Sequence, residues 1–286
     1  MQDDVSFTPP PDESRRQFLV TKLALGFAAA VCPVAADTIH TDRDGLDAHE
    51  VTVKVRDGEM PAYRAMPAAG GPFPMILVVQ EIFGVHEHIK DICRRLAKLG
   101  YFAIAPELYA RQGDVSALEN VQEILSKVVS KVPDEQVMND LDDTVDWVEK
   151  HRHADTSRLG ITGFCWGGRI VWLYAAHSTR LKGGAAWYGP VKGEVSALRP
   201  KTVLELAPEI KAPVLGLYGG KDQGIPVEQV EQMRAALIAA HKPCEIVVYP
   251  DAGHGFNADY RQSYNEAAAK DAWQHMLTWF LKCGVR

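Results

Sequence analysis

The pattern that most constrains this chain is an alternation between short, continuous apolar runs and longer stretches with helical periodicity. Residues 75–79 are all apolar, as in a strand buried on both faces, and apolar residues at helical spacing follow over residues 89–99. The same strand signal returns at residues 101–105, 158–162, 184–188, 213–218 and 245–249. This alternation predicts an α/β fold with a mostly parallel central sheet, helices on both faces, and a ligand site at the carboxyl ends of the strands.

The remaining elements fit one catalytic domain over residues 50–286. Asp57-Gly58 lies between two β-prone stretches and predicts an opening hairpin. Helical patterns cover residues 117–129 and 136–150, with Pro133 between them. A chain of 286 residues that is 47% hydrophobic is long enough to bury a sizeable core.

Residues 1–36 have the order of a twin-arginine export signal, and residues 37–49 read as a linker. The twin arginine at 15–16 precedes a mostly apolar run over residues 23–36, which is too short to span a membrane and ends in small residues. We expect the twin-arginine export machinery as a partner, cleavage near Asp37, no stable membrane insertion afterwards and a periplasmic location. The alternative is an ordinary amphipathic helix; if the signal is not used, the protein stays cytoplasmic.

Charge and cysteine content narrow the function classes. The formal net charge is -6 with both signs interspersed, which argues against nucleic acid as a partner. Five cysteines without a C-x-x-C pair do not form a disulfide scaffold. Cys93, Cys244 or Cys283 could pair in an oxidising periplasm, although we expect buried thiols. We expect a monomer.

Cys165 is the candidate nucleophile. It stands at the centre of residues 163–168, Gly-Phe-Cys-Trp-Gly-Gly, between a predicted strand and an apolar helical stretch. Glycines permit the tight, strained turn that exposes such a nucleophile, and the start of a helix favours its thiolate. The alternative is a structural cysteine among packing glycines.

Two further residues complete a triad in the chain order nucleophile, acid, histidine. Asp222 follows the strand predicted at residues 213–218, and His254 follows the strand predicted at residues 245–249. His254 would act as the base and Asp222 would orient it. Taken alone, an aspartate in a glycine-rich turn is more often a turn former.

The loop after residues 75–79 supplies other candidates. The backbone N-H groups of Ile82 and Trp166 would form an oxyanion hole. Glu81 would stand beside the thiol and take its proton or hold it away from His254, unless it is a surface glutamate. The two histidines of residues 86–88 do not share a helix face, so we expect no metal site.

At these residues the chain resembles the dienelactone hydrolase family, the carboxymethylenebutenolidases, from about Glu50 onward. The matching motifs are residues 80–84, 105–112, 163–168, 218–222 and 249–254. The resemblance implies an α/β-hydrolase fold, a Glu81 that contacts the resting cysteine and takes part in its activation, and an Arg111 that helps to bind the substrate carboxylate. The family's further arginine shortly after the histidine is missing here, where residues 257–259 read Asn-Ala-Asp.

These features predict a cofactor-independent hydrolase that cleaves a small ester or lactone through a Cys-His-Asp triad and an acyl-enzyme. One alternative is thioester or peptide hydrolysis on the same triad, since fold and triad do not fix the substrate. The other is an inactive binding protein on a hydrolase scaffold.

Overall fold

The computed structural model describes residues 38–118, 120–151 and 154–286. The predicted export signal and its cleavage point therefore lie outside the described residues and stay a prediction. Within the described residues, eight strands form one sheet in the order β1-β2-β4-β3-β5-β6-β7-β8. The strands are β1 (Leu46–Val55), β2 (Gly58–Pro67), β3 (Phe73–Val79), β4 (Phe102–Pro106), β5 (Ala154–Phe164), β6 (Gly183–Trp187), β7 (Val214–Gly219) and β8 (Glu245–Tyr249).

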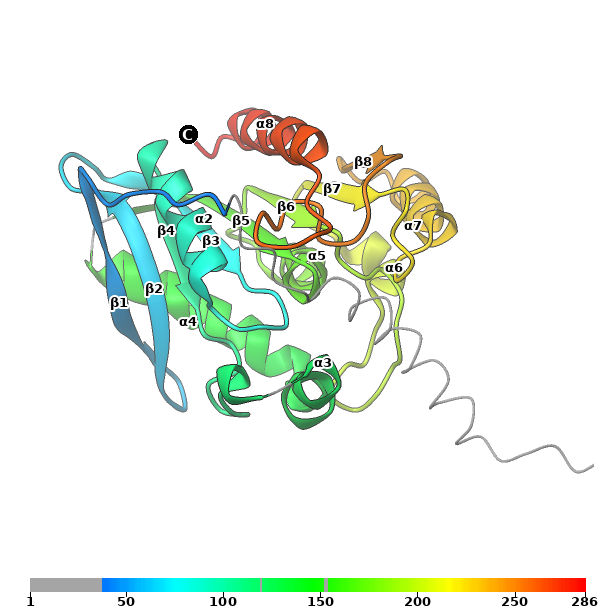
Figure 1. Cartoon of the computed structure of the whole chain (residues 1–286), viewed down its shortest axis with the longest axis horizontal. Helices are drawn as coiled ribbons and strands as arrows, with labels where there is room; N and C mark the ends of the chain where they lie inside the picture. The colour runs from blue at the N-terminus through cyan, green and yellow to red at the C-terminus, as the bar shows by residue number, and fades with distance from the viewer. Residues whose placement is uncertain (1–37, 119, 152–153) are drawn as a thin grey trace, which may run out of the picture.

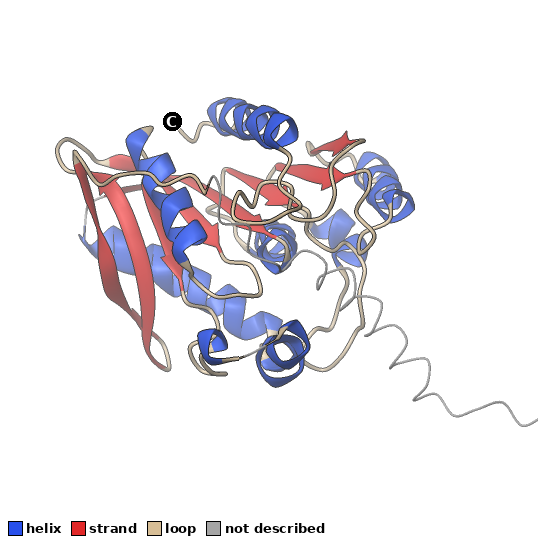
Figure 2. Ribbon diagram, in the orientation of Figure 1, coloured by secondary structure: helices blue, strands red, loops and turns tan. Residues whose placement is uncertain are grey.

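Six strands run parallel, and only β1 and β2 pair in antiparallel fashion with their neighbours. Helices α2 and α8 cover one face of the sheet, whereas α4 and α5 lie on the other (Figure 1, Figure 2). The longer helices are α2 (Glu87–Lys98), α4 (Asp134–His151), α5 (Trp166–His177), α7 (Val227–Ala239) and α8 (Glu266–Lys282), and two short ones are α3 (Val121–Glu123) and α6 (Val203–Leu206). The predicted α/β architecture is confirmed.

The hairpin forms where it was predicted but begins earlier. Its turn lies at Arg56 and Asp57, and β1 starts at Leu46, inside the segment expected to be a linker. Part of that segment is held by α2, because the Thr41 backbone N-H donates to the Asp91 carboxylate at 2.6 Å. The catalytic domain is therefore ordered from the first described residues after the predicted signal.

The helix expected over residues 117–129 is broken into short pieces. A 3₁₀ turn η1 (Val115–Ala117) is followed by α3, a π-helical segment η2 (Ile124–Val128) and a second 3₁₀ turn η3 (Val129–Lys131). The Ser126 hydroxyl donates to the Gln122 carbonyl at 2.7 Å and the Ser130 hydroxyl to the Ser126 carbonyl at 2.9 Å. Such bonds back to the preceding turn compete with regular helix geometry.

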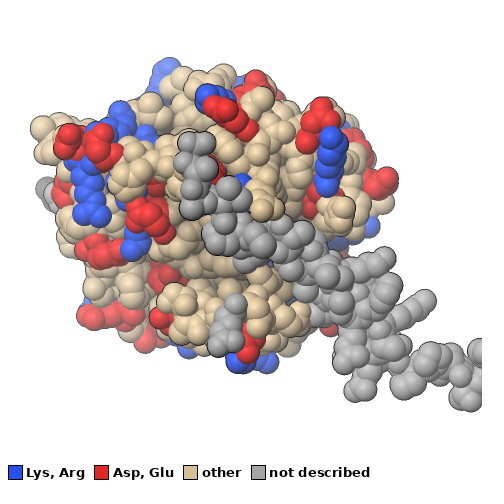
Figure 3. Space-filling model, in the orientation of Figure 1, with Lys and Arg blue, Asp and Glu red and all other residues tan. Residues whose placement is uncertain are grey.

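The surface carries interspersed charges of both signs on the face that Figure 3 shows. No helix among the described residues has both the length and the apolar composition that a membrane crossing requires. The four described cysteines are free thiols; Cys93 and Cys165 are buried, and Cys244 and Cys283 are partly buried.

Candidate active site

Cys165 occupies a strained turn between β5 and α5. Its backbone has φ 57° and ψ -116°, and residues other than glycine rarely adopt such a positive φ. The Cys165 N-H donates to the Trp187 carbonyl at 3.0 Å, and its own carbonyl accepts from the Gly168 and Arg169 N-H groups. Strain of this kind persists where surrounding contacts fix it, and it is concentrated at functional sites.

The glycines after Cys165 let α5 approach the ends of two strands. A Cβ on Gly167 would lie 2.5 Å from the carbonyl oxygens of Val79 and Gln80, and one on Gly168 would lie 2.5 Å from that of Trp187. These positions exclude any side chain. The close approach brings the loop after β3 beside the first turn of α5.

Asp222 and His254 meet in the loops after β7 and β8. The His254 Nδ1 and an Asp222 carboxylate oxygen are 2.7 Å apart, and the other Asp222 oxygen accepts from the Gly224 and Ile225 backbone N-H groups at 2.9 and 3.0 Å. Burial opposes a charge on His254, but Cys165 and the hydrogen bond to the Asp222 carboxylate outweigh it and raise the pKa of His254 to about 10. The structure therefore brings together the three residues that the sequence singled out.

Glu81 is fully buried in the turn after β3 and belongs to a second cluster. One of its carboxylate oxygens accepts from the Tyr260 hydroxyl at 2.7 Å and lies 3.4 Å from both Arg261 Nη2 and His86 Nε2. Burial disfavours the carboxylate, yet Arg261 and His86 hold the pKa of Glu81 well below its usual range. Among the described residues, Cys165 is not a hydrogen-bond partner of Glu81, and the second carboxylate oxygen has none.

Sequence reasoning missed Arg261 and Tyr260. Both lie just beyond residues 257–259, the stretch in which the family resemblance would place a second arginine. Arg261 is 5% exposed and its guanidinium lies over the rings of Phe83 and Tyr260, 4.7 and 4.9 Å from their centroids. Burial opposes the charge of Arg261, but Glu81 and Tyr260, and to a lesser extent Cys165, raise its pKa, so the guanidinium lies within electrostatic range of the thiol.

The loop that carries Arg261 is tied to α2. Asp259, in the stretch that lacks the expected arginine, pairs with Arg95 at 2.5 Å and lies 3.3 Å from His88 Nδ1. Both histidines of residues 86–88 thus have carboxylate neighbours, Glu81 and Asp259.

Ile82 and Trp166, whose backbone N-H groups are predicted to form an oxyanion hole, lie in the loop after β3 and at the start of α5. Ile82 is in the turn closed by the Glu81–Gly84 bridge, and Trp166 is the first residue of α5. Neither backbone N-H donates to a protein acceptor in the described part of the chain. The Trp166 ring packs against the buried Tyr109, with centroids 4.9 Å apart.

Arg111 is held away from this cluster by two carboxylates. Its guanidinium contacts Asp140 at 2.6 and 2.8 Å and Asp57 at 2.6 and 3.2 Å. Asp57 lies in the β1–β2 turn and Asp140 on α4. The substrate-binding role expected for Arg111 stays a prediction, and no contact of its side chain with the candidate catalytic residues supports it.

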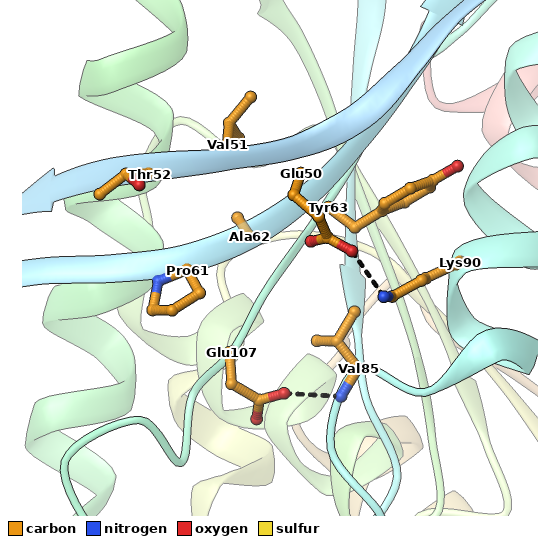
Figure 4. A pocket seen from close by; sticks show the side chains of 9 residues that line it. All are labelled: Glu50, Val51, Thr52, Pro61, Ala62, Tyr63, Val85, Lys90 and Glu107. Atoms are coloured by element: carbon orange, nitrogen blue, oxygen red, sulfur yellow. Dashed lines mark hydrogen bonds and ion pairs between the residues drawn. The ribbon is translucent and has the colours of Figure 1, made fainter. Parts of the chain in front are cut away.

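A surface cavity of about 560 Å³ lies between the β1–β2 hairpin and the start of α2 (Figure 4). Glu107 lines it and accepts from the Val85 N-H at 2.8 Å, and a Lys90–Glu50 ion pair crosses it. None of the candidate catalytic residues lines this cavity, so geometry and chemistry point to the carboxyl edge of the sheet instead.

Comparisons with known proteins agree on one family. The model of the dienelactone hydrolase family matches residues 60–284. A protein of Methylorubrum extorquens named "Putative carboxymethylenebutenolidase" is 64% identical over 273 residues, 95% of this chain and 94% of that protein. The crystal structure of a "Putative Dienelactone Hydrolase" from Klebsiella pneumoniae is 56% identical with a TM-score of 0.81, covering 83% of this chain and 99% of that one.

A more distant relative has a name that specifies a reaction. It is the "Probable 2-oxo-3-(5-oxofuran-2-ylidene)propanoate lactonase" of Bradyrhizobium sp., 31% identical over 231 residues, which are 79% of this chain and 91% of that protein.

Proposed function

The chain belongs to the dienelactone hydrolase family of the α/β-hydrolase superfamily and is a hydrolase, and we propose that it cleaves a lactone or carboxylic ester through an acyl-enzyme on Cys165. The observation that carries this proposal is the position of His254, buried between Cys165 and Asp222 with a raised pKa. A base so placed takes the thiol proton and later returns it to the leaving group.

In the first half of the reaction, the Cys165 sulfur attacks the carbonyl carbon while His254 holds the thiol proton. The oxyanion that forms accepts hydrogen bonds from the Ile82 and Trp166 N-H groups. The C-O bond to the alkoxide then breaks, His254 protonates that oxygen, and a thioester on Cys165 remains. In a lactone the released hydroxyl stays attached to the acyl group.

In the second half, His254 takes a proton from water, and the resulting hydroxide attacks the thioester carbonyl. The C-S bond breaks, the carboxylic acid leaves, and the proton returns to the Cys165 sulfur. Asp222 keeps the imidazole in the orientation that both halves need.

Glu81 acts here as a fixed charge and not as the base. A carboxylate whose pKa lies well below its usual range binds a proton weakly, whereas His254, with its raised pKa, binds one readily. The fixed anion balances Arg261 beside the thiol and so limits how strongly Arg261 stabilises the thiolate in the resting enzyme.

The substrate that we propose is a lactone or ester with a carboxylate of its own. The Bradyrhizobium relative is named a probable lactonase for such a molecule, in which a propanoate is attached to the lactone ring. Arg261, the buried cation of the cluster near Cys165, is already paired with Glu81, so it is not free to balance that carboxylate.

The test is turnover of cis- and trans-dienelactone and of p-nitrophenyl acetate, with Cys165→Ala as the variant and Cys283→Ala as a control thiol far along the chain. We expect wild type and Cys283→Ala to hydrolyse all three substrates, with a burst of p-nitrophenolate from p-nitrophenyl acetate. Cys165→Ala should lose both the burst and the turnover. A wild-type protein that neither turns over nor acylates at Cys165 would falsify the proposal and favour an inactive binding protein. Turnover restricted to thioesters or peptides would favour the other hydrolase reactions.

A further inference from the structure

Arg199 differs from the other arginines that are at least partly buried in the described part of the chain. Each of the others pairs with a carboxylate, as Arg261 does with Glu81 and Arg169 with Asp134. The only hydrogen-bond acceptor of the Arg199 guanidinium in the described residues is the Val129 carbonyl oxygen, and no acidic side chain lies within ion-pair distance. A guanidinium has five N-H donors, so most of them have no protein acceptor.

The turn that carries Arg199 is firmly held. Residues Ser196 and Arg199 exchange backbone hydrogen bonds of 2.9 and 3.1 Å, and the Ser196 hydroxyl accepts from the Arg199 N-H at 3.2 Å. The Asp134 N-H donates to the Leu198 carbonyl at 2.9 Å, which fastens the turn to the start of α4. These bonds fix the backbone at Arg199, and the Val129 carbonyl oxygen holds one end of the guanidinium, which lowers the cost of ordering it when a ligand binds.

The connection that follows β6 leaves the carboxyl end of that strand and reaches across to the segment around α3 (Figure 1). Arg199 belongs to this connection, and its guanidinium contacts Val129 of that segment. The buried Tyr109 links it to Cys165. Burial, Cys165 and Glu107 raise the pKa of Tyr109 well above its usual value, and Arg199 opposes them, so Cys165 and Arg199 both act on the Tyr109 hydroxyl through their charges. The Tyr109 ring packs on Trp166, the residue next to the nucleophile.

The charges around Arg199 favour an anion there. Burial and the neighbouring Arg169 lower the pKa of Arg199 from its usual value, with partial compensation from Asp134. Asp134 is already bound to Arg169 through two hydrogen bonds of 2.6 and 2.7 Å. An anionic ligand would supply the charge partner that the protein does not.

We propose that Arg199 binds the free carboxylate of the substrate while the scissile carbonyl lies at Cys165. This inference rests on the proposed function and adds a specificity-determining residue to it. Carboxylates fit the planar fork of a guanidinium through two parallel hydrogen bonds, which favours substrates with a carboxylate a few bonds away from the reacting carbonyl.

The experiment compares an anionic ester, mono-p-nitrophenyl glutarate, with the neutral p-nitrophenyl valerate, whose acyl chain has the same length. In Arg199→Met we expect kcat/KM for the anionic ester to fall about 10- to 100-fold, mainly through KM, because a charge-assisted hydrogen bond is lost. The neutral ester should change less than about twofold, and Arg199→Lys should recover part of the loss. The matched control is Arg180→Met, since Arg180 pairs with Asp146 and Glu149 and should leave both esters unchanged.

If Arg199→Met changes kcat/KM equally for both esters, or leaves kcat/KM for the anionic ester unchanged, Arg199 does not bind the substrate carboxylate. Cys165-dependent turnover of the valerate would still support the proposed function. If the protein turns over neither these esters nor the dienelactones and p-nitrophenyl acetate, the proposed function fails, and a binding measurement then tests Arg199 by itself. Glutarate binding, measured by tryptophan fluorescence, should then be at least tenfold tighter to wild type than to Arg199→Met. Equal affinity, or no binding to wild type, overturns the inference.

Discussion

Two buried carboxylates lie near Cys165, and the groups that hold them differ in kind. Asp222 is fixed by two backbone N-H groups and by His254, whose charge changes with its proton. Glu81 is fixed by a phenol, by His86 and by Arg261, and of these it is Arg261 that brings a permanent charge. The Asp222 cluster can transfer a proton through His254. Protonation of Glu81, in contrast, would leave the buried Arg261 cation without its carboxylate partner.

The pKa directions follow this difference. Cys165 and Asp222 raise the pKa of His254 to about 10 against the effect of burial, so the imidazole holds a proton easily. Arg261 and His86 lower that of Glu81 despite its burial, so Glu81 keeps its charge. In the proposed mechanism, proton transfer therefore belongs to the cluster after β7 and β8, whereas the cluster after β3 supplies a fixed field and structural support.

The largest expected effect concerns activity. Asp222→Asn keeps the shape of the side chain but removes the charge that orients the His254 tautomer, and kcat for p-nitrophenyl acetate should fall about 10⁴-fold. Glu81→Gln, made for comparison, should cost far less, because Glu81 transfers no proton in the proposed reaction. Steady-state kinetics at pH 7 measures both. Losses of equal size would break the distinction between the two clusters.

The next effect is on stability. Arg261→Met leaves Glu81 buried without its cation and should lower the free energy of unfolding by about 3 to 5 kcal/mol in urea. Adding Glu81→Gln to Arg261→Met should recover at least half of this loss, because the uncompensated charge is gone. Arg234→Met is the control, since Arg234 forms a surface pair with Glu231 and should cost less than about 1 kcal/mol. A double variant no more stable than Arg261→Met would show that packing, not charge, explains the loss.

The sheet and the nucleophile turn could be predicted because their signals are local. Apolar runs mark β3 to β8, and the glycines around Cys165 reflect contacts that leave no room for a Cβ. Asp222 and His254 could be found because each directly follows a strand, and parallel strands end at the same edge.

The second cluster could not be predicted in the same way. Arg261 and Glu81 are 180 positions apart, and only the folded loop after β8 brings them together. Arg111 was expected to bind substrate but instead pairs with two carboxylates, on the hairpin turn and on α4, that lie 54 and 29 positions away in the sequence. A side chain's partner across such separations depends on tertiary structure, which no local pattern records.

The smallest effect is expected from Tyr260→Phe, which removes only the hydroxyl that donates to Glu81 at 2.7 Å. The free energy of unfolding at pH 7 should fall by about 1.5 to 3 kcal/mol, the range for a hydrogen bond to a charged group. Tyr264→Phe, four positions along and not bonded to Glu81, should change it by less than about 0.5 kcal/mol.

The pH dependence of that loss tests its cause. The folded-state pKa of Glu81 lies below its usual value of 4.5, so the stability that its partners provide is fully present above that pH. This stability is lost as the pH falls through the folded-state pKa, because the carboxylate then binds a proton. The difference between wild type and Tyr260→Phe in urea unfolding should therefore be smaller at acid pH, below 4.5, than at pH 7. A difference that stays constant or grows in acid would mean that Tyr260 supports the fold by packing alone, and Glu81 would then owe its charge to Arg261 and His86.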